Sequence, residues 1–319
     1  MRYVFLFLLV LSLLSPAIRS QEDVRHQLDQ VDLLEKKGQY EQAIRSLRSV
    51  IDTISPSAIG TMGRAWTLLA IAHEDEGHYQ KAQSAYEQAL HVLGGDPRYL
   101  SEYAEALTFF AGFNEFAQRQ EVANKLFTKA LKIHEQLGNH RAIAMDCGYL
   151  AEDEGRKKHV RAAKKFLQQA FAEAALAPVF TDQDSEFLAN AQGWVAHVDG
   201  DTKAEIVAYL RSLEFARQNC DGACPRTGWA YLFLGNAYAD SKDWVQAATN
   251  MRQGLALLSQ TIGQKNPQFL AGETLFAKVL EHQGMRDEAS QLRSHAETRL
   301  KELQNEECVA CTVSVAGLR

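Results

Sequence analysis

The stretch HEDEGH, from His73 to His78, places two imidazoles around three carboxylates, which are groups that can ligate a metal ion. In the HExxH metal-binding motif, the two histidines lie four residues apart on one face of a helix. Here they lie five apart. That spacing rotates one about 140° from the other around a helix of 3.6 residues per turn. Gly77 stands between them and is expected to end the helix. We therefore expect no metal site here and interpret the stretch as a turn between two helices.

The five cysteines suggest structural roles. The segment CDGAC begins at Cys220 and ends at Cys224, and the segment CVAC begins at Cys308 and ends at Cys311. Each cysteine pair could form a local disulfide in an oxidising compartment. Cys147 lies in the apolar pattern AIAMDCGYLA and is predicted to be a buried thiol. The CVAC spacing also occurs in thioredoxin-like redox motifs, but no βαβ pattern surrounds it here. A structural disulfide is favoured over redox catalysis.

The basic run RKKHVRAAKK, residues 156–165, raises the alternative of phosphate or nucleic-acid binding. It follows the acidic EDE at 152–154, so we favour a solvated turn and an outer helix face. No P-loop, GxGxxG or GxSxG sequence occurs in a strand–helix setting, and no Ser–His–Asp order is supported. We therefore predict no catalytic, cofactor-binding or metal-ligating residues, no cofactor, and no enzymatic activity.

The whole chain has 319 residues, of which 46% are hydrophobic and 23% charged, and helix-forming residues recur throughout. This composition predicts an all-α protein. Its first twenty residues, MRYVFLFLLVLSLLSPAIRS, have the layout of a secretory signal peptide, with cleavage expected after Ala17 or Ser20. An uncleaved N-terminal anchor is the alternative, and no second hydrophobic segment follows. The expected location is secreted or periplasmic.

Cleavage at Ser20 would leave 32 basic and 40 acidic residues, a net charge of −8 with histidines neutral. This charge argues against nucleic-acid partners. The expected division is a signal peptide at 1–20, a helical region at 21–306 and a C-terminal tail with CVAC at 307–319.

A sequence repeat accounts for the residues of HEDEGH better than a metal site does. Patterns of small and aromatic residues recur about seven times, with separations of 39, 41, 40, 42, 42 and 42 residues between equivalent positions. Those equivalent positions are Ala43, Ala82, Ala123, Ala163, Glu205, Ala247 and Ala289. Glu205 departs from the alanine of the other copies. The fourth copy, with Gly155 taken as its turn, is expected to have about three extra residues there.

The pattern resembles the tetratricopeptide repeat, whose signature is W-x2-L-G-x2-Y followed by A-x3-F. In the second copy it is carried by Trp66, Leu69, Ala70, Gly77 and Tyr79. The lengthened copies are similar to those of kinesin light chains. The resemblance covers residues 24–300 and implies a right-handed α-solenoid of about seven helix–turn–helix repeats.

The resemblance also implies that the first helix of each pair lines a concave groove that binds peptides. Carried over position by position, the candidate groove residues are Arg64, Glu74, Glu115, Tyr149, Glu152, Asp153, Asn190, Trp194, Asn236 and Lys278. Only Asn236 matches a carboxylate-clamp asparagine, and Leu232 stands at the clamp lysine position, so a chaperone-tail clamp is doubtful. The mixture of acidic and aromatic residues suits an extended segment with basic and apolar groups. Solvated helix ends and aromatic packing are the alternative interpretation.

The function expected from the sequence is a non-enzymatic, exported scaffold or adaptor for an unknown protein or peptide. Two alternatives stay open: an accessory or sensor subunit of a cell-envelope assembly, and an enzyme whose site is assembled across the groove. The sequence leaves the partner and the oligomeric state open.

Overall fold

The computed structural model describes residues 16–94, 96–220 and 223–307, and the regular elements in this part of the chain are all helices. The first four pairs are α2 (Pro16–Lys36) with α3 (Tyr40–Thr53), α4 (Ile59–Glu76) with α5 (Tyr79–Leu93), α6 (Leu100–Phe116) with α7 (Gln120–Leu137), and α8 (His140–Arg156) with α9 (Val160–Leu176). The last three are α10 (Asp182–Asp199) with α11 (Thr202–Gln218), α12 (Pro225–Asp240) with α13 (Trp244–Thr261), and α14 (Pro267–His282) with α15 (Arg286–Glu307). A short 3-10 helix, η1 (Pro97–Tyr99), precedes α6. The predicted all-α solenoid of seven helix pairs is confirmed.

Every helix pair turns at a residue with a left-handed backbone, five positions before the equivalent alanine or glutamate. These residues are Gly38 (φ 72°), Gly77 (φ 92°), Gln118 (φ 59°), Lys158 (φ 60°), Gly200 (φ 77°), Lys242 (φ 64°) and Gly284 (φ 81°). The prediction of extra residues in the fourth turn is wrong, because the turn is at Lys158 and not at Gly155. Gly155 lies inside α8, where an added Cβ would be 2.9 Å from Trp194 Nε1.

The core runs along the solenoid in the contacts between successive helices. The six equivalent alanines are at most 1% exposed, because the two helices of each pair cross closely there. Large side chains such as Tyr86, Phe113 and Phe127 fill the spaces between neighbouring pairs and are fully buried. A single pair has no partner for its apolar face, so stacking of neighbours supplies the burial.

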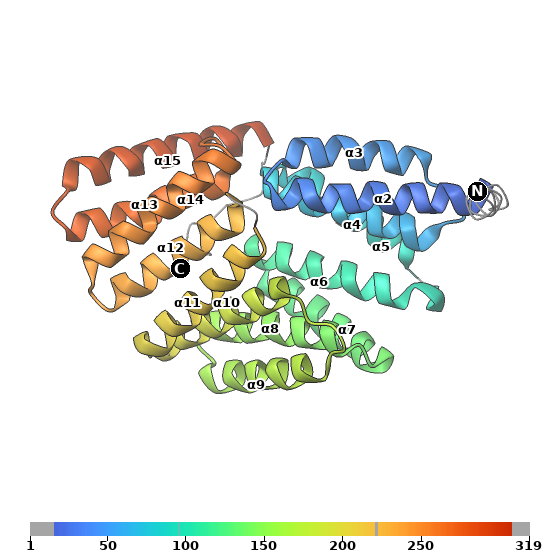
Figure 1. Ribbon diagram of the computed structural model, residues 1–319, viewed down its shortest axis with the longest axis horizontal. Helices are drawn as coiled ribbons and strands as arrows, with labels where there is room; N and C mark the ends of the chain where they lie inside the picture. Colours follow the sequence, from blue (N-terminus) through green and yellow to red (C-terminus); the bar gives the residue numbers. More distant parts are fainter. Residues whose placement is uncertain (1–15, 95, 221–222, 308–319) are drawn as a thin grey trace, which may run out of the picture.

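The solenoid curls until its first two repeats lie beside its last two (Figure 1). Asn266 Nδ2 donates a hydrogen bond of 2.8 Å to the backbone oxygen of Asp75, and Gln268 Nε2 donates one of 3.0 Å to Asp75 Oδ1. An added Cβ on Gly77 would be 2.6 Å from Pro267 Cγ. The turns of the first two repeats therefore close against the beginnings of α12 and α14, and Asp75 and Asn266 are 191 residues apart in the chain.

The expected domain limits stay predictions. Helix α2 begins at Pro16 and passes through the expected cleavage positions, and α15 ends at Glu307. The tail with Cys308 and Cys311 lies outside the described residues, as do residues 1–15. Within the described residues, every helix is too short or too polar to cross a membrane.

Candidate functional site

The stretch that resembled a metal site is a helix turn, as the sequence predicts. Helix α4 continues three residues past His73 and ends at Glu76, and Gly77 caps it with a φ of 92° that glycine adopts most easily. The His73 and His78 rings meet edge to face with their centroids 5.5 Å apart. Burial, together with the positive groups of His78 and Arg48, lowers the pKa of His73 to about 4. The pair thus contributes packing between α3, α4 and α5.

Two cavities of about 620 and 340 Å³ lie on the concave side of the solenoid. They share Tyr149, Glu152, Arg156 and Trp194, and together we call them the groove. The first is bordered mainly by α4, α6 and α8, and the second by α8, α10 and α12. The first helices of successive pairs form the wall, as the family resemblance implies.

Four carboxylates and one guanidinium line the groove. The carboxylates are Glu74, Asp75, Glu115 and Glu152, and the guanidinium belongs to Arg156. Arg156 forms an ion pair with Glu115, and its Nη2 lies 4.0 Å from Glu152 Oε2. Hydrogen bonds to Asp240 and Glu205 raise the pKa of His197, which borders the smaller cavity, to about 10, so two positive groups face these four acids. The wall keeps an excess of negative charge when all four acids are ionised.

These carboxyls hold their protons unusually tightly. Burial and the neighbouring Asp75 raise the pKa of Glu74 to about 8, although Tyr86 donates a hydrogen bond of 2.9 Å to Glu74 Oε2. Burial raises the pKa of Glu115 to about 7 against the opposing effect of Arg156. Burial also raises the pKa of Asp75 to about 6. The charge of the groove therefore changes between pH 6 and 8.

Aromatic rings make up much of the remaining wall. The Tyr149 ring packs against Phe127 and Phe187, with centroids 5.2 and 4.4 Å away. Trp194 stacks on His197 at 5.3 Å and donates a hydrogen bond of 3.2 Å from Nε1 to the backbone oxygen of Glu152. Tyr149 and Trp194 thus hold neighbouring helices together as well as facing the groove.

Seven of the ten residues carried over from the family border the groove. These are Glu74, Glu115, Tyr149, Glu152, Asn190, Trp194 and Asn236. Arg64 is exposed and Lys278 half-buried, and neither is among the bordering residues. Asp153 is fully buried, and its Oδ2 accepts hydrogen bonds from Asn124 Nδ2 at 3.0 Å and Lys157 Nζ at 2.5 Å. Asp153 therefore faces α7 and not the groove.

The interpretation of residues 156–165 as wholly solvated is wrong at its first residue. Arg156 points into the groove and pairs with Glu115, and its guanidinium lies 5.6 Å from the centroid of the Trp194 ring. Lys157 pairs with Asp153 and Glu154. The signal that could have found Arg156 is its place at the end of a first helix, seven residues before Ala163, as Asp75 is before Ala82.

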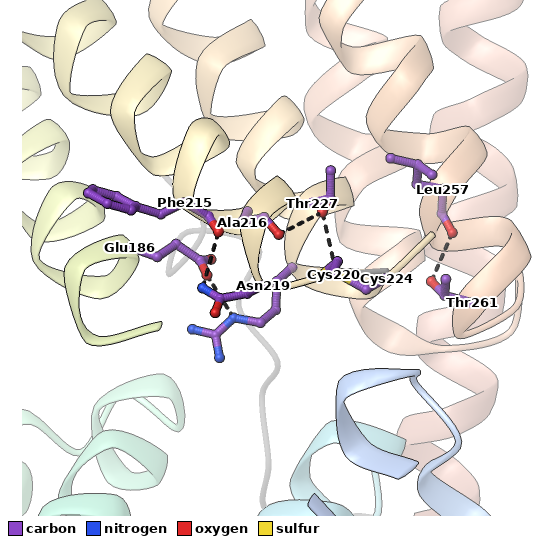
Figure 2. The surroundings of a disulfide bond; sticks show 10 residues. Glu186, Phe215, Ala216, Asn219, Cys220, Cys224, Thr227, Leu257 and Thr261 are labelled. Atoms are coloured by element: carbon purple, nitrogen blue, oxygen red, sulfur yellow. Dashed lines mark hydrogen bonds and ion pairs between the residues drawn. A yellow bond between two sulfur atoms is a disulfide. The ribbon is translucent and has the colours of Figure 1, made fainter. Parts of the chain in front are cut away.

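The segment CDGAC precedes α12 and its cysteines form a disulfide, with Cα atoms 6.0 Å apart (Figure 2). Thr227 Oγ1, in the first turn of α12, donates to the backbone oxygen of Ala216 near the end of α11 and lies 3.3 Å from Cys224 Sγ, so the disulfide lies where these two helices meet. Pro225, the next residue, would contact a Cβ added to Gly38 at 2.9 Å. The disulfide therefore lies beside the closing contact of the solenoid. Cys147 is buried and unpaired, and burial raises the pKa of its thiol to about 12.

Comparison with known proteins agrees with the fold. Residues 63–106 match the family model of the tetratricopeptide repeat. No curated protein matches the sequence significantly. The structure is similar to the Rap conjugation gene regulator of plasmid pLS20 in complex with a Phr peptide, with a TM-score of 0.66 and 14% identity over 91% of this chain and 77% of that chain.

Two other solved structures share this architecture. A Rap protein complexed with competence and sporulation factor gives a TM-score of 0.62 and 14% identity, over 89% of this chain and 79% of that chain. A signal transduction ATPase from Pyrococcus horikoshii, described as having a tetratricopeptide repeat sensor, gives 0.54 and 13%, over 85% of this chain and 41% of that chain. At these identities the likeness shows the fold alone.

Proposed function

We propose that this chain, a tetratricopeptide-repeat protein, is a non-enzymatic scaffold that binds an extended peptide or protein segment in its groove. The bound segment carries basic and apolar side chains. Repeat solenoids use extended concave surfaces of this kind for binding. The similar Rap regulator, whose structure contains a peptide, supports a peptide as the occupant.

The observation that carries this proposal is the composition of the groove wall. Four carboxylates with a single guanidinium among them border cavities that are otherwise largely aromatic. Lysine and arginine side chains complement such a wall in two ways, because they pair with carboxylates and also stack on aromatic faces. Apolar side chains of the same segment would cover the rings of Tyr149 and Trp194.

The test is a selection of random peptides displayed on phage, carried out at pH 8 with the chain from residue 21 to 319. We expect enriched peptides to combine lysine or arginine with apolar residues. The double variant Glu74→Gln with Glu152→Gln should bind them at least about tenfold more weakly, since charge-assisted contacts contribute about 1.5–3 kcal/mol each. Glu281→Gln is the matched control, because Glu281 is exposed and pairs with Arg293 at 2.6 Å away from the groove.

Two results would overturn the groove proposal. One is enrichment of acidic or uncharged peptides, and the other is equal affinity of the double variant and the Glu281→Gln control. Glutamine variants are better suited than Tyr149→Ala with Trp194→Ala. Both rings are half-buried and pack between neighbouring helices, so their loss would disturb the fold as well.

We further propose that the chain is exported, which the layout of residues 1–20 supports. The Cys220–Cys224 disulfide is consistent with an oxidising compartment. N-terminal sequencing of the protein from its native host should begin at Ile18 or Gln21. A mature chain that begins at Met1 and sediments with membranes would favour the uncleaved anchor instead.

A further inference from the structure

His197, Glu205 and Asp240 meet near the wall of the groove, where the end of α10, the start of α11 and the end of α12 come together. His197 Nδ1 lies 2.7 Å from Asp240 Oδ2 and 3.3 Å from Glu205 Oε1. One ligating atom from each residue lies within 4.8 Å of the other two. His197 also borders the smaller cavity, beside Trp194.

Glu205 departs from the repeat in a way that the fold does not explain. It occupies the position that is alanine in the six other copies, where the two helices of a pair cross. It is 1% exposed, and neither of its carboxylate oxygens accepts a hydrogen bond of acceptable geometry, although His197 Nδ1 lies 3.3 Å from Oε1. Burying an ionised carboxylate without a partner costs several kcal/mol. The compensating positive charge beside Glu205 can come from a protonated His197 or from a bound metal ion.

We propose that His197, Glu205 and Asp240 bind a divalent transition-metal ion, for which Zn²⁺ is the probe. One imidazole nitrogen with two carboxylate oxygens suits zinc, whereas magnesium and calcium prefer ligand sets made only of oxygen. Three protein ligands leave a coordination position open. The exposed Asp240 side chain at the end of α12 is the ligand that can adjust when the ion binds.

The ring of His197 is already held in place for this role. Trp194 stacks on it with 26° between the ring planes, and Nδ1 faces both carboxylates. The ion would lie at the edge of the groove, with its open position available to water or to a bound segment. This role is additional to the proposed peptide binding and does not depend on it.

The competing explanation is a protonated His197 that bridges the two carboxylates without a metal. The chain contains a matched example of a simple pair, since His295 Nδ1 lies 2.7 Å from Glu273 Oε2. In the described residues, no third acidic or sulfur ligand joins that pair. His295→Ala is therefore the control for His197→Ala.

The test is zinc titration of the EDTA-treated chain from residue 21 to 319 against a chromogenic chelator. Cys308→Ser and Cys311→Ser are present in every sample, because a CxxC thiol pair also binds zinc. We expect one Zn²⁺ per chain and a higher unfolding temperature with zinc. His197→Ala and Asp240→Asn should each weaken zinc binding at least about tenfold, whereas His295→Ala should leave it unchanged.

Glu205→Ala is the most specific test of the zinc site, because it restores the alanine found in the other six copies. It should retain its helical circular dichroism and lose the rise in unfolding temperature with zinc. The proposal is overturned if the unsubstituted ligand set takes up no stoichiometric zinc. It is also overturned if Glu205→Ala and Asp240→Asn bind zinc as tightly as the parent.

Discussion

Glu74 has to satisfy two opposing conditions. It lies on the groove wall where a basic ligand would need its charge, yet burial and Asp75 raise its pKa to about 8. Glu115 and Asp75, with pKa values of about 7 and 6, share this conflict. An arriving lysine or arginine would stabilise the ionised carboxylates and expel their protons, so ligand binding and pH are coupled.

We expect the free protein to lose stability as the pH rises from 6 to 8. Glu74 binds its proton more tightly in the folded chain than in the unfolded chain, where the pKa is near 4.5. Its contribution is therefore complete below that value and is lost as the pH rises through the folded pKa. Glu74→Gln cannot ionise, and should reduce the loss by about 2 kcal/mol, because solvent in the groove weakens the full effect of about 1.4 kcal/mol per pKa unit.

Urea unfolding at pH 6, 7 and 8 measures this difference, with Glu281→Gln as the control. Affinity for a basic peptide should change in the opposite direction and increase over the same range. A parallel pH dependence in Glu74→Gln and in the unsubstituted protein would show that Glu74 is not the titrating group.

Residue positions within the repeat placed seven of the ten candidates correctly on the groove, because equivalent positions in successive copies face the same side. Arg156 was missed because its neighbours Lys157 and Lys158 suggested a solvated basic turn. Glu205 was noticed as an exception, but its partners His197 and Asp240 come from two other helices. Their meeting depends on how α10, α11 and α12 pack, which the periodicity of one copy does not specify.

At the scale of the helix pair, the backbone geometry of the turns is more regular than their amino-acid sequence. Gly77, Gly200 and Gly284 are recognisable from the sequence, whereas Gln118, Lys158 and Lys242 adopt the same left-handed backbone without being glycine. Such a backbone costs a residue with a Cβ about 1–2 kcal/mol. The hydrogen bonds and packing of two full helices outweigh that cost, and so a glycine search misplaced the fourth turn.

Lys242→Gly should therefore stabilise the protein. Lys242 is exposed with a φ of 64°, and glycine would relieve the strain at the cost of more freedom in the unfolded chain. We expect a gain of about 0.5–1 kcal/mol in the free energy of unfolding, measured in urea. Arg211→Gly, at an exposed position in the middle of α11, should lower it by about 1 kcal/mol. A loss of stability in both variants would contradict the strain argument.

At the scale of the whole molecule, closure of the solenoid decides the shape of the groove. Each copy adds a small rotation to the last, and seven copies bring Asp75 to Asn266 and Gln268. The sequence predicts the number of copies but not this meeting, because the rotation per copy depends on the side chains between neighbouring pairs. Closure joins the two ends through a few contacts, so it can be tested separately from folding.

Gly77→Ala and Gly200→Ala form a matched pair for that test. Both residues have a left-handed backbone, so each substitution should cost about 1–2 kcal/mol. A Cβ at Gly200 meets nothing within 4 Å, whereas one at Gly77 would be 2.6 Å from Pro267 Cγ. Only Gly77→Ala should therefore speed hydrogen exchange around residues 262–270 and increase the radius of gyration in solution scattering. Equal exchange in the two variants would mean that the ends of the solenoid do not hold each other, and that the groove keeps its shape through the stacking of neighbouring pairs alone.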